Sequence, residues 1–182
     1  KLCEALGKQN NFNAICLMPT NLYGPGDNYH PMNSHVLPSM INNFYTAKIK
    51  NLGKVTCWGT GSPMREFLYV DDLAEASIFT LENISTENRS LYDDQNNFNG
   101  ILNVGVGKEI SIKELAEQIS SIVGYQGRII WDSMKPDGTP RKLLDISKMK
   151  KLGWEAKTDL KEGIRKTLEF YKNEFHNKSI RS

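Results

Sequence analysis

Residues 13–34, NAICLMPTNLYGPGDNYHPMNS, are the stretch that decides the fold. The apolar run NAICLM at its start predicts a short buried strand. The residues from Pro19 to Ser34 are rich in Pro, Gly, Asn and His and predict a long loop, and apolar residues recur at helical spacing from Val36 onward. In an α/β fold, ligands bind beyond the carboxyl ends of the strands. This loop is therefore the first place where we expect a functional site.

The rest of the chain also alternates between strand and helix patterns. Apolar runs predict strands over 54–58, 66–70, 101–106 and 128–131. Further helices are predicted after Asp71 and Asp72, which we expect to act as N-caps, after Ser111, which can form a capping box with Glu114, and from about residue 158. This alternation predicts an α/β architecture.

Two other polar segments separate these elements. Residues 83–100 predict a surface loop, and residues 132–140 form a second loop rich in Pro and Gly. Asp137 lies in a tight Pro-Asp-Gly turn of this second loop, and turn chemistry explains its presence.

Composition narrows the classes of partner. The 182 residues are 39% hydrophobic and 24% charged, as in an ordinary folded protein, and the net charge of +2 with a pI near 8.4 is too mild to argue for nucleic acid. No apolar run approaches the length of a membrane span, and no signal peptide is visible. Cys3, Cys16 and Cys57 form neither a CxxC pair nor a zinc pattern, so we expect a reducing, cytoplasmic location and no metal site.

Four stretches carry a resemblance to a known family. They are MPTNLYGPGDNYHPMNSHVLP (18–38), WGTGSPMREFLYVDDLAEAS (58–77), LNVGVGKEISIKELA (102–116) and KPDGTPRKLLD (135–145). Together they resemble the extended short-chain dehydrogenase/reductases and, among these, the GDP-L-fucose synthase family. The Asn-Val-Gly-x-Gly and Val-Asp-Asp patterns occur in many nucleotide-sugar enzymes, whereas the combination of the other motifs is much narrower. The resemblance runs from Lys1 to Phe175.

This resemblance implies a fold, a reaction and partners. It implies the C-terminal part of a Rossmann-like domain over residues 1–80, and mainly a smaller α/β substrate-binding domain over 81–182, with the chain crossing between the two more than once. The family epimerises GDP-4-keto-6-deoxy-mannose at C3 and C5 and then reduces C4 with NADPH, so the expected partners are a GDP-sugar and NADP. The resemblance also implies a homodimer for the whole protein.

The resemblance places a proton donor and a cofactor-side segment in the first loop. His35 matches the histidine that acts as the acid in the epimerisation, and an imidazole can hold and release a proton near neutral pH. The simpler alternative is a histidine at a helix start that hydrogen-bonds only to backbone. Pro19, Thr20, Asn21 and Leu22 match the segment that runs beside the nicotinamide, with backbone groups freed after Pro19. Taken alone, this sequence is only a turn signal.

Several residues match positions that hold the nucleotide sugar: Trp58, Arg65, Arg128, Arg141 and Lys142. Guanidinium groups suit diphosphate oxygens, and lysine supplies a more flexible charge. We expect Arg65 to point into a cleft and only one of the consecutive pair at 141–142 to reach phosphate, while Trp58 could equally be a core residue. One position departs from the family, because Asn43 stands where a basic residue contacts the substrate, and an amide cannot neutralise phosphate charge.

Other family features do not occur in these residues. There is no GxxGxxG or GxGxxG loop, and none of the seven tyrosines has a lysine four positions on. The family's catalytic cysteine matches none of the three cysteines, and Cys16 reads as a core residue. We therefore expect a C-terminal part whose NADP is bound mostly by residues upstream, and which is inactive alone. Two alternatives remain open: another NAD(P)-dependent nucleotide-sugar epimerase or dehydratase, and a non-catalytic nucleotide-sugar-binding fragment.

Overall fold

The computed structural model describes all residues except 11, 32, 93–94, 96–97, 178 and 180–182. Its strands are β1 (Cys16–Pro19), β2 (Asn21–Tyr23), β3 (Lys54–Trp58), β4 (Met64–Arg65), β5 (Phe67–Tyr69), β6 (Ile101–Val104), β7 (Ile110–Ser111), β8 (Arg128–Asp132) and β9 (Arg141–Lys142). Its helices are α1 (Leu2–Asn10), α2 (Val36–Ile49), α3 (Val70–Asn83), the 3₁₀ turn η1 (Arg89–Leu91), α4 (Ile112–Val123), α5 (Ser147–Lys151) and α6 (Leu160–Asn177). The predicted α/β fold is confirmed.

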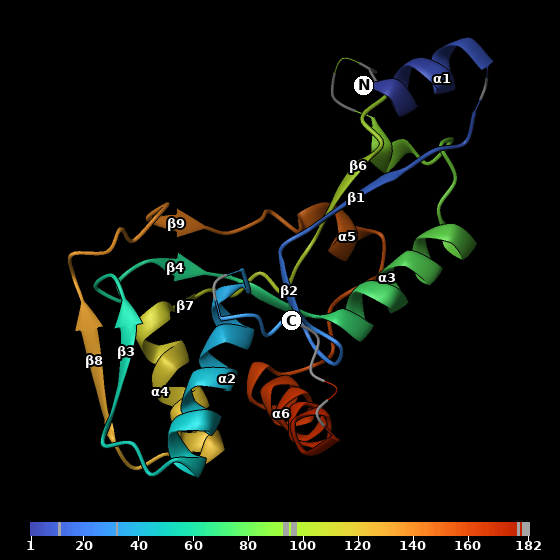
Figure 1. Ribbon diagram of the computed structural model, residues 1–182. Helices are drawn as coiled ribbons and strands as arrows, with labels where there is room; N and C mark the ends of the chain where they lie inside the picture. The colour runs from blue at the N-terminus through green and yellow to red at the C-terminus, as the bar shows by residue number, and fades with distance from the viewer. Residues whose placement is uncertain (11, 32, 93–94, 96–97, 178, 180–182) are drawn as a thin grey trace.

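The strands pair mostly in parallel. β1 pairs with β6, β2 with β5, and β3 with β8, all in parallel (Figure 1). A fourth, three-stranded sheet places β4 between β7, which is antiparallel to it, and β9, which is parallel to it. The chain through β1 and β2 therefore changes partner at Thr20, from β6 on one side to β5 on the other. Such a change of partner opens a crevice at the carboxyl ends of the strands.

Two hydrophobic cores hold these elements together. The larger core lies among α2, α4 and α6 and reaches β3 and β5, with Phe44, Leu115, Ile119, Leu168 and Tyr171 all 2% exposed or less. The smaller core joins α3, β6 and α5 through Ala76, Leu102, Val104 and Met149, among others. Each core contains residues from both 1–80 and 81–182, because the chain passes between them several times. The division at residue 80 stays a prediction.

Most predicted elements are confirmed with small shifts at their ends. The strands over 54–58 and 128–132, and the helices that begin at Val36 and Leu160, lie where the sequence places them. The capping box is present: the Ser111 hydroxyl accepts the Glu114 N–H at 3.1 Å, and Glu114 accepts the Ser111 N–H at 3.0 Å. α4 ends at Gly124 in the left-handed conformation, as a helix C-terminus favours.

Other expectations were wrong, in each case because distant segments supply the partner. The loop after Pro19 contains β2, whose three residues are too few to show a strand pattern and are stabilised by β5. Asp72 does not cap α3; it lies in the first turn, and its buried carboxylate accepts the Thr158 N–H at 3.0 Å. The segment 83–100 has a buried anchor in Leu91, which is fully enclosed in the smaller core.

No helix in the part of the chain that the structure describes is both long and apolar enough to cross a membrane.

Candidate active site and nucleotide-sugar site

A cavity of about 440 Å³ lies at the point where the chain passes from β1 to β2. Thr20, Asn21 and Leu22 line it, and so does His35, which directly precedes α2. Val70, at the start of α3, also lines it. The structure therefore brings together the predicted proton donor and three of the four residues predicted to lie beside the nicotinamide. Pro19 is exposed at the end of β1 and is absent from this lining.

His35 occupies the N-cap position of α2 but does not cap it. Its backbone is extended, with φ −69° and ψ 165°, and its imidazole makes no capping hydrogen bond. Its backbone carbonyl accepts the Ser39 N–H at 3.0 Å instead. Because the ring is exposed and lines the cavity, the simpler alternative of a histidine that only satisfies the helix start does not describe its side chain.

The backbone after Pro19 makes more hydrogen bonds within the fold than the sequence suggests. The Thr20 N–H donates to the Val104 carbonyl at 3.0 Å, and residues 21–23 are paired with β5. The Asn21 amide donates to the Glu66 carbonyl at 2.8 Å. The cavity is therefore lined by a strand that, among the described strands, pairs only with β5, rather than by a free loop.

A second cavity, of about 290 Å³, is lined by residues of α2 and by the end of β3. Asn43 and Trp58 both line it, although one is on α2 and the other at the end of β3. Trp58 is 64% exposed, so the alternative that it is a core residue is wrong. The Lys135 ammonium lies 5.3 Å from the centre of the Trp58 ring, a cation–π distance. An exposed indole beside an open cavity is a platform on which a base or sugar ring can stack.

Arg65 and Lys142 are register partners on the parallel strands β4 and β9. Register partners project from the same face of a sheet, while neighbours along a strand project from opposite faces. Arg141 is thus on the other face from Lys142, and it is bound to Glu109 with Nε–O distances of 2.8 and 3.1 Å. The Arg65 guanidinium, half-buried, donates back to the Met64 carbonyl at 2.8 Å. The structure therefore distinguishes the consecutive basic pair, and Lys142 is the member beside Arg65.

Arg128 is not brought together with these residues. It lies at the start of β8, opposite Lys54, whereas Trp58 pairs with Asp132 at the other end of the strand. Four residues of parallel strand separate those ends, roughly 13 Å. Its predicted role receives no geometric support from the described neighbours.

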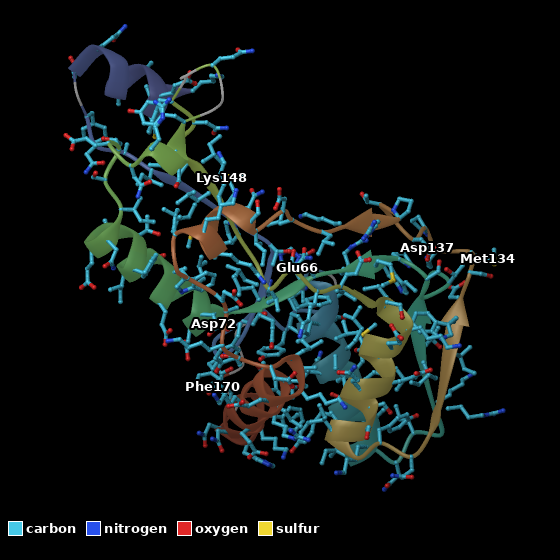
Figure 2. The ribbon with its side chains drawn as sticks, turned by 180° about the vertical axis from the view of Figure 1, so that it is seen from behind. Glu66, Asp72, Met134, Asp137, Lys148 and Phe170 are labelled. Atoms are coloured by element: carbon cyan, nitrogen blue, oxygen red, sulfur yellow. The ribbon has the colours of Figure 1, made fainter. Side chains whose placement is uncertain are left out.

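Asp137 has a long-range role that the sequence analysis missed. Its carboxylate, on the residue labelled in Figure 2, accepts the Thr60 N–H at 2.7 Å and the Thr60 hydroxyl at 2.8 Å. These bonds tie the loop after β8 to the loop after β3. The turn explanation was therefore incomplete. The sequence analysis also missed the contact of Lys135 with Trp58. Lys135 and Asp137 both lie in the stretch 135–145, where charged residues alternate with Pro and Gly, and this pattern was the available signal.

The cysteines behave differently from one another. Burial raises the pKa of the Cys57 thiol to about 11, so it stays protonated near neutral pH. Cys16 is not a core residue as expected: it is half-buried, and a hydrogen bond with the neighbouring Cys3 raises its pKa. Among the described residues, no group of three or more His, Cys, Asp or Glu side chains is arranged to hold a metal ion.

Parallel strands, a crevice at their carboxyl ends and a histidine that lines it are the features of an α/β protein with a ligand-binding cleft at its strand ends. Comparisons with known proteins agree with this class. Residues 1–105 match the NAD dependent epimerase/dehydratase family. The chain belongs to this family.

The relatives point to nucleotide-sugar enzymes. The chain is 52% identical over 171 residues to the Probable GDP-L-fucose synthase 1 of Oryza sativa subsp. japonica, covering 94% of this chain and 48% of the relative. A GDP-6-OMe-4-keto-L-xylo-heptose reductase from C. jejuni has a TM-score of 0.87 at 34% identity, covering 95% of this chain and 57% of that one.

A GDP-L-fucose synthetase from Naegleria fowleri bound to NADP has a TM-score of 0.76 at 25% identity. The match covers 89% of this chain and 47% of that one. The chain spans about half the length of the curated relatives it matches. The resemblance to the GDP-L-fucose synthase family that the four motifs predicted is confirmed.

Proposed function

We propose that this chain forms the substrate-binding part of an NADP-dependent enzyme that converts GDP-4-keto-6-deoxy-mannose to GDP-L-fucose. The observation that supports the proposal is the cavity lined by both His35 and the segment Thr20–Leu22, which we expect to face the nicotinamide. The 52% identity to a probable GDP-L-fucose synthase supports the choice of substrate.

The chemistry requires a proton donor in this position. C3 and C5 both lie next to the C4 ketone, so removal of either proton gives an enolate. Inverting the carbon requires that a proton be returned on the opposite face. His35 is exposed to the cavity and makes no capping bond, so its ring is free to deliver that proton. The base is expected among residues outside this chain.

The residues near the cavity fit a nicotinamide ring. The Asn21 side-chain oxygen and the open edge of β2 offer acceptors and donors to a carboxamide, while Leu22 and Val70 offer apolar surface. When bound, NADPH supplies a hydride for reduction at C4. We propose that residues 19–22 orient the ring and that most of the cofactor's contacts lie upstream in the whole protein.

The nucleotide sugar is proposed to extend from the first cavity toward the second. Arg65 and Lys142, on one face of the sheet, suit the diphosphate, and Trp58 suits the base or sugar ring. Asn43 lines the same cavity as Trp58 and offers hydrogen bonds without charge. A site with a basic residue at position 43 would have one more cation near the phosphate. We therefore predict that this site binds phosphate more weakly than such a site.

Titration calorimetry of this chain with GDP, GDP-L-fucose, UDP and NADPH separately tests the proposal. Binding of the two guanine ligands with little binding of UDP supports it. Preference for UDP would favour another nucleotide-sugar epimerase or dehydratase. Binding of GDP with an unchanged catalytic rate in the whole protein after loss of His35 would show that this chain contributes binding and not the proton donor.

Three further expectations are part of the proposal. The 182 residues alone are not expected to transfer hydride, because they contain neither a glycine-rich phosphate loop nor a Tyr-x-x-x-Lys pair. The whole protein is expected to be a cytoplasmic homodimer. Light scattering of the whole protein measures its oligomeric state directly.

A further inference from the structure

Glu66 is a fully buried acidic residue at the centre of the molecule (Figure 2). It lies between β4 and β5, directly after Arg65. None of the ion pairs formed by described residues includes it. A buried carboxylate without a cation is costly unless hydrogen bonds replace its water. Its partners therefore decide what it does.

Three backbone N–H groups from two distant segments donate to the Glu66 carboxylate. Oε1 accepts the Val106 N–H at 2.7 Å and the Gly107 N–H at 2.6 Å, just after β6. Oε2 accepts the Leu144 N–H at 3.1 Å, two residues after Lys142. Gly105 lets the carboxylate approach so closely, because a Cβ there would overlap the Glu66 side chain. The acid thus joins the end of β6 to the segment that follows β9.

The backbone carbonyl of the same residue holds a third segment. It accepts the Asn21 amide at 2.8 Å and the Thr20 hydroxyl at 3.3 Å. Thr20 is the residue at which the chain leaves β6 and begins to pair with β5. Glu66 therefore links two segments: its carbonyl accepts from Thr20 and Asn21 on the cofactor-side wall, and its carboxylate accepts from the segment that follows Lys142.

We propose that Glu66 is a positioning residue that fixes Lys142 beside Arg65 and aligns this cationic pair with the Thr20–Leu22 wall. Because its side chain is buried, it acts through these residues and not by touching the ligand. The inference rests on the proposed function in one respect, namely that Arg65 and Lys142 bind phosphate.

The substitution Glu66→Gln tests the proposal with little change in shape. The amide oxygen can still accept from Val106 and Gly107, so its NH₂ group faces the Leu144 N–H, and two donors then oppose each other. The expected result is faster amide exchange over residues 142–146, with little change at 106–107. GDP binding is expected to weaken by about tenfold or more, since a charged hydrogen bond is lost next to the cationic pair.

Asp72→Asn is the matched control. Asp72 is also buried, at 3% exposed, and it accepts the Thr158 N–H at 3.0 Å and hydroxyl at 3.1 Å. It joins α3 to the start of α6 and contacts none of the site residues above. A purely structural role for Glu66 would give the two variants similar losses of stability and similar, small changes in GDP affinity.

Each outcome decides between these roles. The proposal is supported if Glu66→Gln alone releases residues 142–146 and weakens GDP binding. It is overturned if exchange over 142–146 is unchanged, or if Asp72→Asn weakens GDP equally. If the unsubstituted chain binds no GDP, the proposed function fails, while the exchange data still decide whether Glu66 fixes the Lys142 segment. Should Glu66→Gln not fold, Gly105→Ala displaces the same carboxylate without removing it, and the same exchange pattern is expected.

Discussion

Arg65 and Lys142 lie opposite each other on two parallel strands, 77 positions apart in the sequence (142 − 65 = 77), and project from one face of the sheet. Arg141, the neighbour of Lys142, projects from the other face and is held by Glu109. Position along a strand thus gives two consecutive cations different neighbours.

This separation predicts unequal effects of removing each cation. Arg65→Ala and Lys142→Ala are each expected to weaken GDP binding by roughly 10- to 100-fold, the range for loss of a charge-assisted hydrogen bond. Titration calorimetry measures the affinities. Arg141→Ala is the matched control and is expected to change the affinity by less than about threefold, since its exposed ion pair contributes little. If GDP affinity fell more in Arg141→Ala than in Lys142→Ala, the phosphate contact would lie on the Arg141 face of the sheet, and the prediction would be wrong.

His35→Gln tests the proton donor in the whole protein. Loss of a general acid typically lowers the rate by about 10²–10⁴-fold. The rate at which epimerised sugar forms in deuterated water, followed by NMR, measures this step. GDP affinity should stay unchanged, because the ring faces the first cavity and not the cationic pair. His176→Gln, at the far end of α6, should leave the rate unaltered; a normal rate in His35→Gln would remove His35 from the chemistry.

Cys57 is predicted to resist alkylation in the folded chain. Burial raises its pKa from 9.0 to about 11, so little thiolate exists at pH 8. Iodoacetamide labelling followed by mass spectrometry should modify Cys57 far more slowly in the native chain than in urea. The folded state favours the neutral thiol, so this contribution to stability is fully present below pH 9 and is lost as the pH rises from 9 toward 11. Equal labelling rates with and without urea would show that the thiol is accessible.

Asp137→Ala should release the contact between the loops after β3 and β8. The Thr60 N–H and hydroxyl lose their acceptor, and because the pair is exposed the expected loss of stability is about 1 kcal/mol or less. Hydrogen exchange should rise over both 59–62 and 133–139. Asp132→Ala removes only a local bond to the Met134 N–H and should affect its own loop alone. Unchanged exchange at 59–62 would refute the link between the loops.

Ser111→Ala is expected to destabilise the fold through α4. It removes one half of the capping box, which typically costs about 1 kcal/mol. Urea unfolding followed by circular dichroism gives the free energy. Ser121→Ala, an exposed site on the same helix, should have an effect near zero or slightly stabilising. Equal stability of the two variants would mean that the cap contributes nothing here.

Patterns among residues close together in the sequence were enough to predict the long helices and strands and to identify the family. Apolar spacing located α2, α4, α6 and the paired strands β3 and β8, because each repeats over enough residues to expose its period. The capping box was readable because both partners lie three residues apart. The residue types of the site were also readable, and the structure does gather His35 with Thr20–Leu22, and Asn43 with Trp58.

The short strands and the residues that pair with them could not be predicted from the sequence. β2, β4 and β9 have two or three residues, and each exists only because a distant strand satisfies its backbone groups. Asp72 and Asp137 look like ordinary cap and turn residues, yet their carboxylates bind Thr158 and Thr60 from other parts of the chain. Spacing along the sequence carries no information about such contacts.

The sequence by itself therefore determined the α/β class and the family, and it predicted the kinds of side chain proposed for the site. Only the tertiary structure decided which cation stands beside Arg65, what Glu66 binds, and that Arg128 lies at the far end of its strand. The physical reason is that periodicity and capping depend on neighbours in sequence. Strand register and buried hydrogen bonds instead depend on which distant groups meet when the two cores close.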